Sequence, residues 1–504
     1  MAIPVRTRSQ TPPFLTTNTI RAFVARIEKL SPLFLRRLQT RVSDSVFLVF
    51  PATQVFRAVA AFRLFLQEAT QSRFARNVWL LAGGTALARA VTAGASPVLA
   101  RIYSPADFGV FAVFFSMVTA AVVTASFNYD QAVLVPKDDE VAAGLVIWAF
   151  CVLLTNTALI ALAVGFFATQ IIHAVGAPGL RGYLWLLPIS VFGGGAFYIL
   201  NAWAIRTASF RSLSKRRIWQ SVWQVLLQLT IPAITPGPLG LLLGDSVGRG
   251  AGSITLAREM AGYVKRHNLR LNFGMIRKAA GAYSRYPTYG LGALLLHISL
   301  SVMPPVLIMA HFGAVVTGAY SFTSLVVGIA SNVIGSSIGQ VYFNKAAVLA
   351  RTEPAELLSL FGRTSALCAV IAAGPFACLA LFGPTLFATV FGANWVQAGA
   401  FARLLAVPYF VIFVASPVFP VLALLQRQPW QLVIDGAGAA LMIGLILTVA
   451  RLHLGAQYAI AAYGISMTFT YLGLYIAAGL AILSRIRSQV ESGSLTIQEE
   501  PQCR

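Results

Sequence analysis

The chain has 504 residues, of which 57% are hydrophobic and only 11% are charged. Its mean hydropathy of +0.75 excludes an ordinary soluble globular domain. The formal net charge of +22 would suggest a nucleic-acid partner in a soluble protein. Here the basic residues lie mostly between apolar stretches, so we interpret them as topology signals and lipid-headgroup contacts and expect no nucleic-acid partner.

Residues 1–76 form a basic N-terminal extension that is poor in acidic residues. It lacks the clean apolar core near its start that a signal peptide requires. Residues 46–66 are apolar, but Arg57 and Arg63 favour an interfacial amphipathic helix over a membrane span. We expect this extension to be disordered or interfacial; a start of translation placed too early is the alternative.

Beyond the extension, the sequence predicts an all-α polytopic membrane protein. A membrane-spanning helix needs about 20 mostly apolar residues. By this criterion there are twelve spans, at 78–100, 108–127, 143–171, 183–205, 218–236, 238–257, 289–311, 314–341, 362–388, 401–425, 431–450 and 457–484. The sixth is the weakest because Asp245 and Arg249 interrupt it.

Lysine and arginine concentrate in the even-numbered connections between these spans. They are Lys137, Arg206, Arg211, Lys215, Arg216, Arg217, Arg258, Lys265, Arg266, Arg270, Arg277, Lys278, Arg285, Lys345, Arg351 and Arg427. The odd-numbered connections are short and carry chiefly Arg101, Arg181, Arg403 and Arg451. Because basic loops mark the cytoplasmic side, we expect both termini to be cytoplasmic in an inner membrane.

The long basic connection divides the spans into two sets of six. We predict an N-terminal lobe at 77–262, a cytoplasmic linker at 263–288, a C-terminal lobe at 289–485 and a polar, disordered cytoplasmic tail at 486–504. A short repeat supports related halves, since Pro97-Val98-Leu99 matches Pro305-Val306-Leu307. Counting eight residues back from each proline gives Arg89 and His297, which therefore occupy matching positions.

The sequence lacks the patterns expected of an enzyme or a metal site. We find no glycine-rich phosphate loop, no His-Glu-x-x-His helix and no set of Ser, His and Asp. The histidines are scattered, so we expect neither a metal nor another cofactor. Polar residues within the spans are therefore the candidate site residues.

Arg89 lies near the middle of the first span, where a charged side chain costs about 2.5–3.5 kcal/mol on insertion scales. It should therefore face a cavity or a partner. Asp245 and Arg249 are four residues apart and share one helix face, as an internal ion pair or a substrate contact. Gly244, Gly248 and Gly252 would allow close approach of a neighbouring helix.

Further candidates are polar or helix-weakening residues in other spans. His297, Asn332, Asn201, Gln224, Gln228 and Gln340 could contact a ligand, although each alone is more often an interhelical hydrogen bond. Pro97, Pro304 and Pro305 are hinge candidates because proline removes a helix hydrogen bond. Arg89, Arg249, Arg101 and His297 make the expected cavity cationic, which favours an anionic, phosphate-bearing cargo.

Seven segments are distinctive: Gly83-Gly84-Thr85, Pro97 to Gly109, Tyr129 to Lys137, Tyr286-Pro287-Thr288-Tyr289, Ser337 to Phe343, Phe391 to Trp395 and Ser416-Pro417. Together they resemble bacterial polysaccharide-biosynthesis flippases, the Wzx-type translocases of O-antigen or exopolysaccharide repeat units in the multidrug/oligosaccharidyl-lipid/polysaccharide (MOP) exporter superfamily. The likeness covers about 77–485.

This resemblance implies two six-helix lobes in a V around a cationic cavity. It implies alternating access that carries an undecaprenyl-diphosphate-linked oligosaccharide to the periplasmic leaflet. We expect a monomer in contact with membrane lipids and with the polymerase and chain-length machinery. Related lipid II flippases have a cavity arginine twelve residues before an arginine in an Ala-Arg-Ile run. Arg89 stands twelve residues before Arg101 in Ala100-Arg101-Ile102, so the resemblance assigns that role to Arg89.

Two other function classes remain open. A multidrug or metabolite antiporter of the same superfamily would need buried carboxylates, and the first six spans supply little beyond Asp245. A membrane-embedded repeat-unit polymerase or ligase would need a long periplasmic loop with clustered arginine and histidine. Because the odd-numbered connections are short, the flippase is the favoured prediction and an enzyme is not expected.

Overall fold

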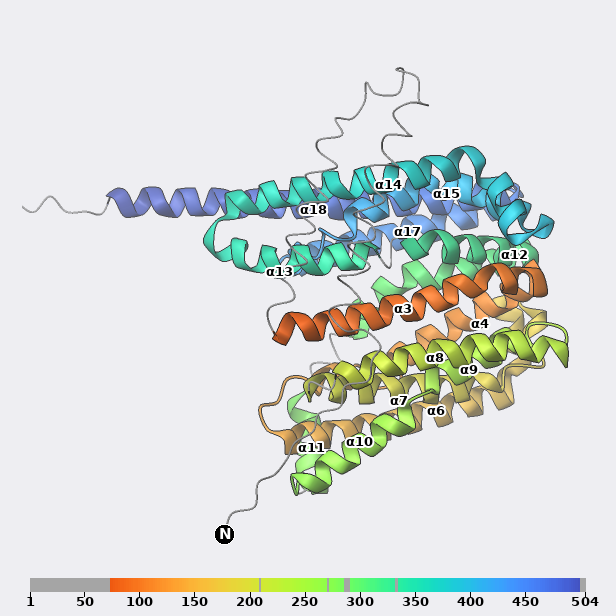
Figure 1. Cartoon of the computed structure of the whole chain (residues 1–504), viewed down its shortest axis with the longest axis horizontal. Helices are drawn as coiled ribbons and strands as arrows, with labels where there is room; N and C mark the ends of the chain where they lie inside the picture. Colours follow the sequence, from red (N-terminus) through yellow and green to blue (C-terminus); the bar gives the residue numbers. More distant parts are fainter. Residues whose placement is uncertain (1–72, 208–209, 270–271, 285–290, 331–333, 499–504) are drawn as a thin grey trace, which may run out of the picture. The chain divides into compact units, whose positions relative to one another are not determined.

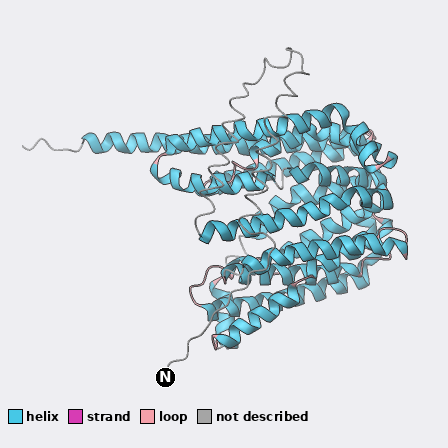
Figure 2. Cartoon of the chain, in the orientation of Figure 1, coloured by secondary structure: helices cyan, strands magenta, loops and turns pink. Residues whose placement is uncertain are grey.

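A computed structural model describes residues 73–207, 210–269, 272–284, 291–330 and 334–498. Within these ranges the chain is helical, with short connections and no strand (Figure 2). The predicted all-α membrane fold is therefore confirmed. The predicted N-terminal extension, up to residue 72, and Asn332 lie outside the described residues.

The N-terminal half comprises long helices with a few short ones at their ends (Figure 1). They are α3 (Arg73–Ile102), α4 (Pro105–Thr124), α5 (Tyr129–Ala132), α6 (Asp139–Val175), α7 (Leu186–Arg206), α8 (Phe210–Thr230), α9 (Leu239–Gly250), α10 (Ser253–Arg266) and α11 (Phe273–Ala282). Two 3₁₀ turns, η1 (Pro178–Leu180) and η2 (Ile231–Ala233), lie in its connections.

The C-terminal half follows the same design of long helices joined by short connections. It comprises α12 (Leu291–Ala330), α13 (Ser336–Thr352), α14 (Pro354–Phe391), η5 (Ala393–Trp395), α15 (Val396–Ala415), α16 (Val421–Leu424), α17 (Gln428–Arg451) and α18 (Ala456–Gln498). Over the described residues of both halves, eight helices are long and apolar enough to cross a membrane. The chain is thus a multi-pass membrane protein, while the count of twelve spans stays a prediction.

The helices differ from the predicted spans at three places. The sixth predicted span is two helices, α9 and α10, because Ala251 is extended (ψ 126°) after the end of α9 and Gly252 adopts a left-handed φ of 93° before the start of α10. The eighth predicted span, 314–341, covers the part of α12 after its break at Gly313 (φ 80°, ψ 178°), which lies between the seventh and eighth predicted spans, and it also includes the start of α13. The predicted disordered tail is helical as far as Gln498, because α18 continues beyond the apolar residues.

The start of α4 illustrates how local sequence sets a helix boundary. Ser104 Oγ accepts a hydrogen bond from the Asp107 amide, and the Asp107 carboxylate accepts one from the Ser104 amide. Pro105 follows at the first helical position, where its missing N–H costs nothing. This capping box turns the chain sharply after α3, which ends at Ile102.

The two halves meet in a close seam between α4 and α12. A Cβ added at Gly109 would lie 2.0 Å from the Ala314 carbonyl oxygen, and one at Gly318 would lie 1.6 Å from that of Pro105. Only glycine permits such approach of the two backbones. An apolar core continues from the seam and contains Leu99 of α3, Phe322 of α12 and Trp395 of η5.

Connections expected on one side of the membrane also meet in the structure. Tyr103, after the first predicted span, donates a hydrogen bond of 2.7 Å to the Gln228 carbonyl near the end of the fifth. Trp395, after the ninth, donates one of 2.7 Å to the Ala100 carbonyl. We call this the odd end of the bundle, and the opposite end, where α6 and α18 carry Asp139 and Arg485, the even end.

Candidate functional site

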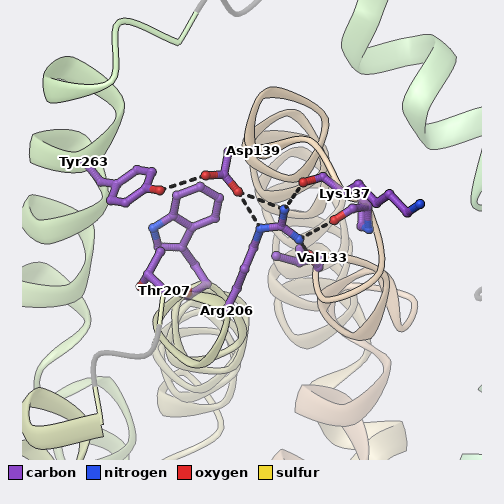
Figure 3. A network of polar contacts seen from close by, with 8 residues as sticks. Val133, Lys137, Asp139, Arg206, Thr207 and Tyr263 are labelled. Carbon is purple, nitrogen blue, oxygen red and sulfur yellow. Dashed lines mark hydrogen bonds and ion pairs between the residues drawn. The ribbon is translucent and has the colours of Figure 1, made fainter.

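At the even end, Arg206 joins the connection after α5 to the end of α7 and the start of α6 (Figure 3). Its Nη2 lies 2.8 Å from Asp139 Oδ1, and its Nη1 donates to the carbonyls of Val133 and Pro136 at 3.3 and 2.6 Å. The Arg206 side chain is only 12% exposed, so these bonds are shielded from water. Arg206 thus ties together the segments at this end.

Tyr263 of α10 extends the network from the other side of Asp139 (Figure 3). Its hydroxyl donates a hydrogen bond of 2.7 Å to Asp139 Oδ2, and this bond raises the pKa of Tyr263. The phenol therefore stays a donor throughout the physiological pH range. A single carboxylate thus holds α6, α7 and α10 together, a structural role that leaves this network outside the candidate transport site.

The candidate transport site lies between α3 and α8, which pack side by side. Arg217 Nη1 donates a hydrogen bond of 2.6 Å to Thr85 Oγ1, and the Arg217 guanidinium is close enough to Arg89 for the two charges to interact. Arg89 follows Thr85 by one helical turn and is exposed. Over the described parts of the chain, neither arginine forms an ion pair with a carboxylate.

Close helix packing brings α8 against α3 beside these two cations. A Cβ added at Gly84 would lie 1.8 Å from Ser214 Oγ, so glycine lets α8 approach α3 beside Thr85. Two unneutralised guanidinium groups within a membrane protein are costly unless they face water or an anion. The arrangement can therefore bind an anion with two forked donors, and phosphate suits that geometry.

Asp245 and Arg249 form an ion pair, which is one of the two alternatives that their spacing left open. Arg249 Nε lies 2.6 Å from Asp245 Oδ2, Nη2 donates to Thr119 Oγ1 at 3.2 Å, and the guanidinium sits 4.5 Å from the Phe115 ring centroid. The Arg249 side chain is 16% exposed and the Asp245 side chain is 6% exposed. Arg249 is therefore neutralised and held in place, in contrast to Arg89.

The structure separates Arg101 from Arg89. Arg101 Nη2 donates a hydrogen bond of 3.0 Å to the Val390 carbonyl at the end of α14. Since twelve helical residues at 1.5 Å each span about 18 Å, Arg101 lies far along α3 from Arg89. It therefore links the two halves at the odd end.

The remaining predicted residues are placed only in part. His297 lies on α12, but its side chain, like Asn332 as a whole, falls outside the described residues. Pro97 lies within α3, and Pro304 and Pro305 lie within α12. The non-helical residue of α12 is Gly313, so the observed break lies beyond these prolines.

Two charged residues of the helices are not among the candidate site residues that the sequence indicates. Arg217 was counted among the basic residues of a loop, whereas the structure places it within α8. Asp435 of α17 is 3% exposed and close enough to Tyr471 of α18 to affect it electrostatically. Asp435 could have been recognised from the sequence, because it is an acidic residue within the apolar predicted span at 431–450.

The fold is similar to that of two proteins of known structure. The lipid II flippase MurJ, in an inward closed conformation, superposes with a TM-score of 0.65 at 10% identity, over 84% of this chain and 94% of that one. An inward-facing multidrug resistance MATE family transporter of the MOP superfamily gives 0.59 at 13% identity, over 80% and 96%. These likenesses show that the chain shares the fold of these two proteins.

The sequence itself places the chain more narrowly. Residues 98–400 match the model of the polysaccharide biosynthesis protein family, and the chain belongs to that family. The succinoglycan biosynthesis transport protein ExoT of Rhizobium meliloti (strain 1021) is 24% identical over 331 residues, which are 65% of this chain and 64% of that protein. The match thus spans a little under two thirds of the relative. The family resemblance expected from the sequence motifs is confirmed.

Proposed function

We propose that the protein is a flippase that translocates undecaprenyl-diphosphate-linked oligosaccharide repeat units across the bacterial inner membrane for polysaccharide biosynthesis. The observation that carries this proposal is the pairing of Arg89 and Arg217 on α3 and α8. A diphosphate supplies the negative charge that two guanidinium groups attract. Family membership and the names of the relatives, a succinoglycan transport protein and a lipid II flippase, support the same cargo class.

The proposed translocation requires no covalent chemistry. The cation pair would hold the diphosphate while the prenyl chain stays in lipid, which lowers the cost of moving a polar headgroup through hydrocarbon. In this proposal the N-terminal and C-terminal six-span lobes move against each other around the seam of α4 and α12. The even end faces the cytoplasm, as its lysine and arginine residues favour.

The test is translocation of a fluorescent undecaprenyl-diphosphate oligosaccharide in proteoliposomes. Arg89→Ala and Arg217→Ala should each slow transport about tenfold or more, because a hydrogen bond to a charged group contributes about 1.5–3 kcal/mol. Arg363→Ala, which removes an exposed arginine of α14, is the control with unchanged transport. Equal rates in the two site variants would remove the cation pair from the substrate path.

The antiporter alternative rests on one observation, the buried carboxylate of Asp435. An ionisable group within the membrane is a default candidate for carrying a coupling ion or proton. Gradient-driven efflux of ethidium from proteoliposomes, lost in Asp435→Asn, together with no movement of the lipid-linked glycan, would favour the antiporter. Glycan movement without ethidium efflux would support the flippase.

A further inference from the structure

A cavity of about 510 Å³ opens at the even end of the C-terminal half, and neither arginine of the cation pair on α3 and α8 lines it. Its walls come from α13, α16, α18 and the connection between α16 and α17. The apolar side chains of Ala350, Leu424 and Ala481 line one part, and the polar side chains of Gln426, Arg427 and Arg485 line another. The cavity is therefore amphipathic.

The backbone fixes Arg427 at the rim of this cavity. Gln426 adopts a left-handed φ of 57°, and the Arg427 amide donates a hydrogen bond of 2.8 Å to the Leu422 carbonyl. This is the arrangement that ends a helix and satisfies its last carbonyls. The Arg427 guanidinium lies 5.1 Å from the centroid of the Trp430 ring, which restricts the side chain further.

The two arginines of the cavity attract an anion. Both are exposed, and neither forms an ion pair with any carboxylate that the structure describes. Two positive charges on one cavity repel each other unless an anion lies between them. A guanidinium group pairs with a phosphate through two parallel hydrogen bonds, so phosphate is the anion that this pair fits best.

The surroundings favour a phosphate that belongs to a lipid. Trp430 is 37% exposed beside Arg427, and tryptophan is enriched where a membrane protein meets the headgroup layer. Further along α17, the apolar side chains of Leu432 and Val433 are 44% and 70% exposed, as lipid-facing residues are. Basic pockets between membrane helices bind the headgroups of anionic lipids.

We propose that this cavity binds the phosphate headgroup of an anionic phospholipid through Arg427 and Arg485. The apolar wall of Ala350, Leu424 and Ala481 receives the start of the acyl chains. The site is independent of the proposed substrate path, and a bound lipid would tie α18 to the connection before α17. Arginines that served only to set the topology would need no such cavity.

The experiment counts lipids bound to the full chain by native mass spectrometry, after titration with phosphatidylglycerol or phosphatidylcholine in detergent. Each basic residue near a membrane contributes about 1 kcal/mol to anionic-lipid binding, or about fivefold in affinity, so Arg427→Gln/Arg485→Gln should bind phosphatidylglycerol roughly 30-fold more weakly. Ser488→Trp, at the exposed rim, should block binding with both charges retained.

The matched control is Arg277→Gln/Lys278→Gln on α11, which removes the same charge from exposed positions in the other half. This control should bind phosphatidylglycerol like the unmodified protein. Equal loss in the control and the site variant would show general charge attraction and overturn the proposal. Equal binding of phosphatidylcholine, or displacement of the lipid by millimolar inorganic phosphate, would overturn the assignment to an anionic lipid.

Discussion

Arg217 on α8 donates a 2.6 Å hydrogen bond to the hydroxyl of Thr85 on α3, one helical turn before Arg89. This contact links two helices whose interacting residues are more than a hundred positions apart in the chain. It holds the Arg217 guanidinium beside the turn of α3 that precedes Arg89. The affinity of the proposed site for a diphosphate should therefore depend on the uncharged side chain of Thr85.

Thr85→Val tests this dependence because valine keeps the shape of threonine and removes the acceptor oxygen. We expect flipping of the lipid-linked glycan to slow about three- to tenfold, as Arg217 loses a hydrogen bond of about 1–1.5 kcal/mol. Thr92→Val is the control on the same helix, because the Thr92 hydroxyl donates only to the Ala88 carbonyl of α3. Equal slowing in both variants would contradict a specific role for Thr85.

The pair of Asp245 and Arg249 can be tested by comparing a single substitution with a double substitution. Asp245→Asn alone leaves a poorly exposed guanidinium without its counter-charge and should destabilise the protein by about 3 kcal/mol. Asp245→Asn/Arg249→Gln should recover much of the thermal stability in detergent and keep transport, if the pair is structural. A stable double variant that no longer transports would instead place Arg249 in the substrate path.

The odd end should open more readily when the contact between Trp395 and Ala100 is lost. Trp395 is fully buried, so Trp395→Phe leaves the Ala100 carbonyl without its indole donor. We expect faster hydrogen–deuterium exchange in the peptide that covers residues 98–108. Trp185→Phe is the control, because Trp185 donates to the Gly182 carbonyl within its own connection. Unchanged exchange in the Trp395 variant would show that the hydrogen bond between Trp395 and Ala100 does not hold the odd end closed.

The seam between α4 and α12 should tolerate no side chain. In Gly318→Ala, the new methyl group would meet the Pro105 carbonyl, so the helices must separate at a cost of about 1–3 kcal/mol. A lower melting temperature in detergent is the expected result. Gly444→Ala on α17 provides the comparison, because a Cβ there meets no atom within 4 Å. A seam variant as stable as this control would show that the halves pack loosely.

The even-end network should contribute to stability without contributing to transport. Arg206→Gln removes the guanidinium that holds Asp139 and two backbone carbonyls, and should lower stability by about 2–3 kcal/mol. Tyr263→Phe removes one hydrogen bond and should cost about 1 kcal/mol. Thermal unfolding of these variants beside Arg258→Gln, at an exposed site of α10, gives the comparison. Stability equal to the Arg258 variant would mean the network is dispensable.

The sequence by itself determined the membrane class, the positions of most long helices and the family. Those features are local, because a run of apolar residues specifies a buried helix wherever it lies in the chain. It also placed Asp245 and Arg249 on one helix face, since residues four apart on a helix share a face, but it left open whether they pair with each other or contact a substrate. The break near residue 313 was likewise expected between two predicted spans.

Only the tertiary structure decided which polar groups meet. The sequence places Arg217 among the basic residues of a connection, whereas in the structure it lies on α8, which packs against α3 beside Gly84. The sequence suggests Arg101 as a cavity residue, whereas in the structure it donates a hydrogen bond to the Val390 carbonyl of α14. Arg427 and Arg485 share a cavity although they lie on separate segments. Contacts between distant segments depend on how small and large side chains fit across helices, and spacing along one helix carries no record of that fit.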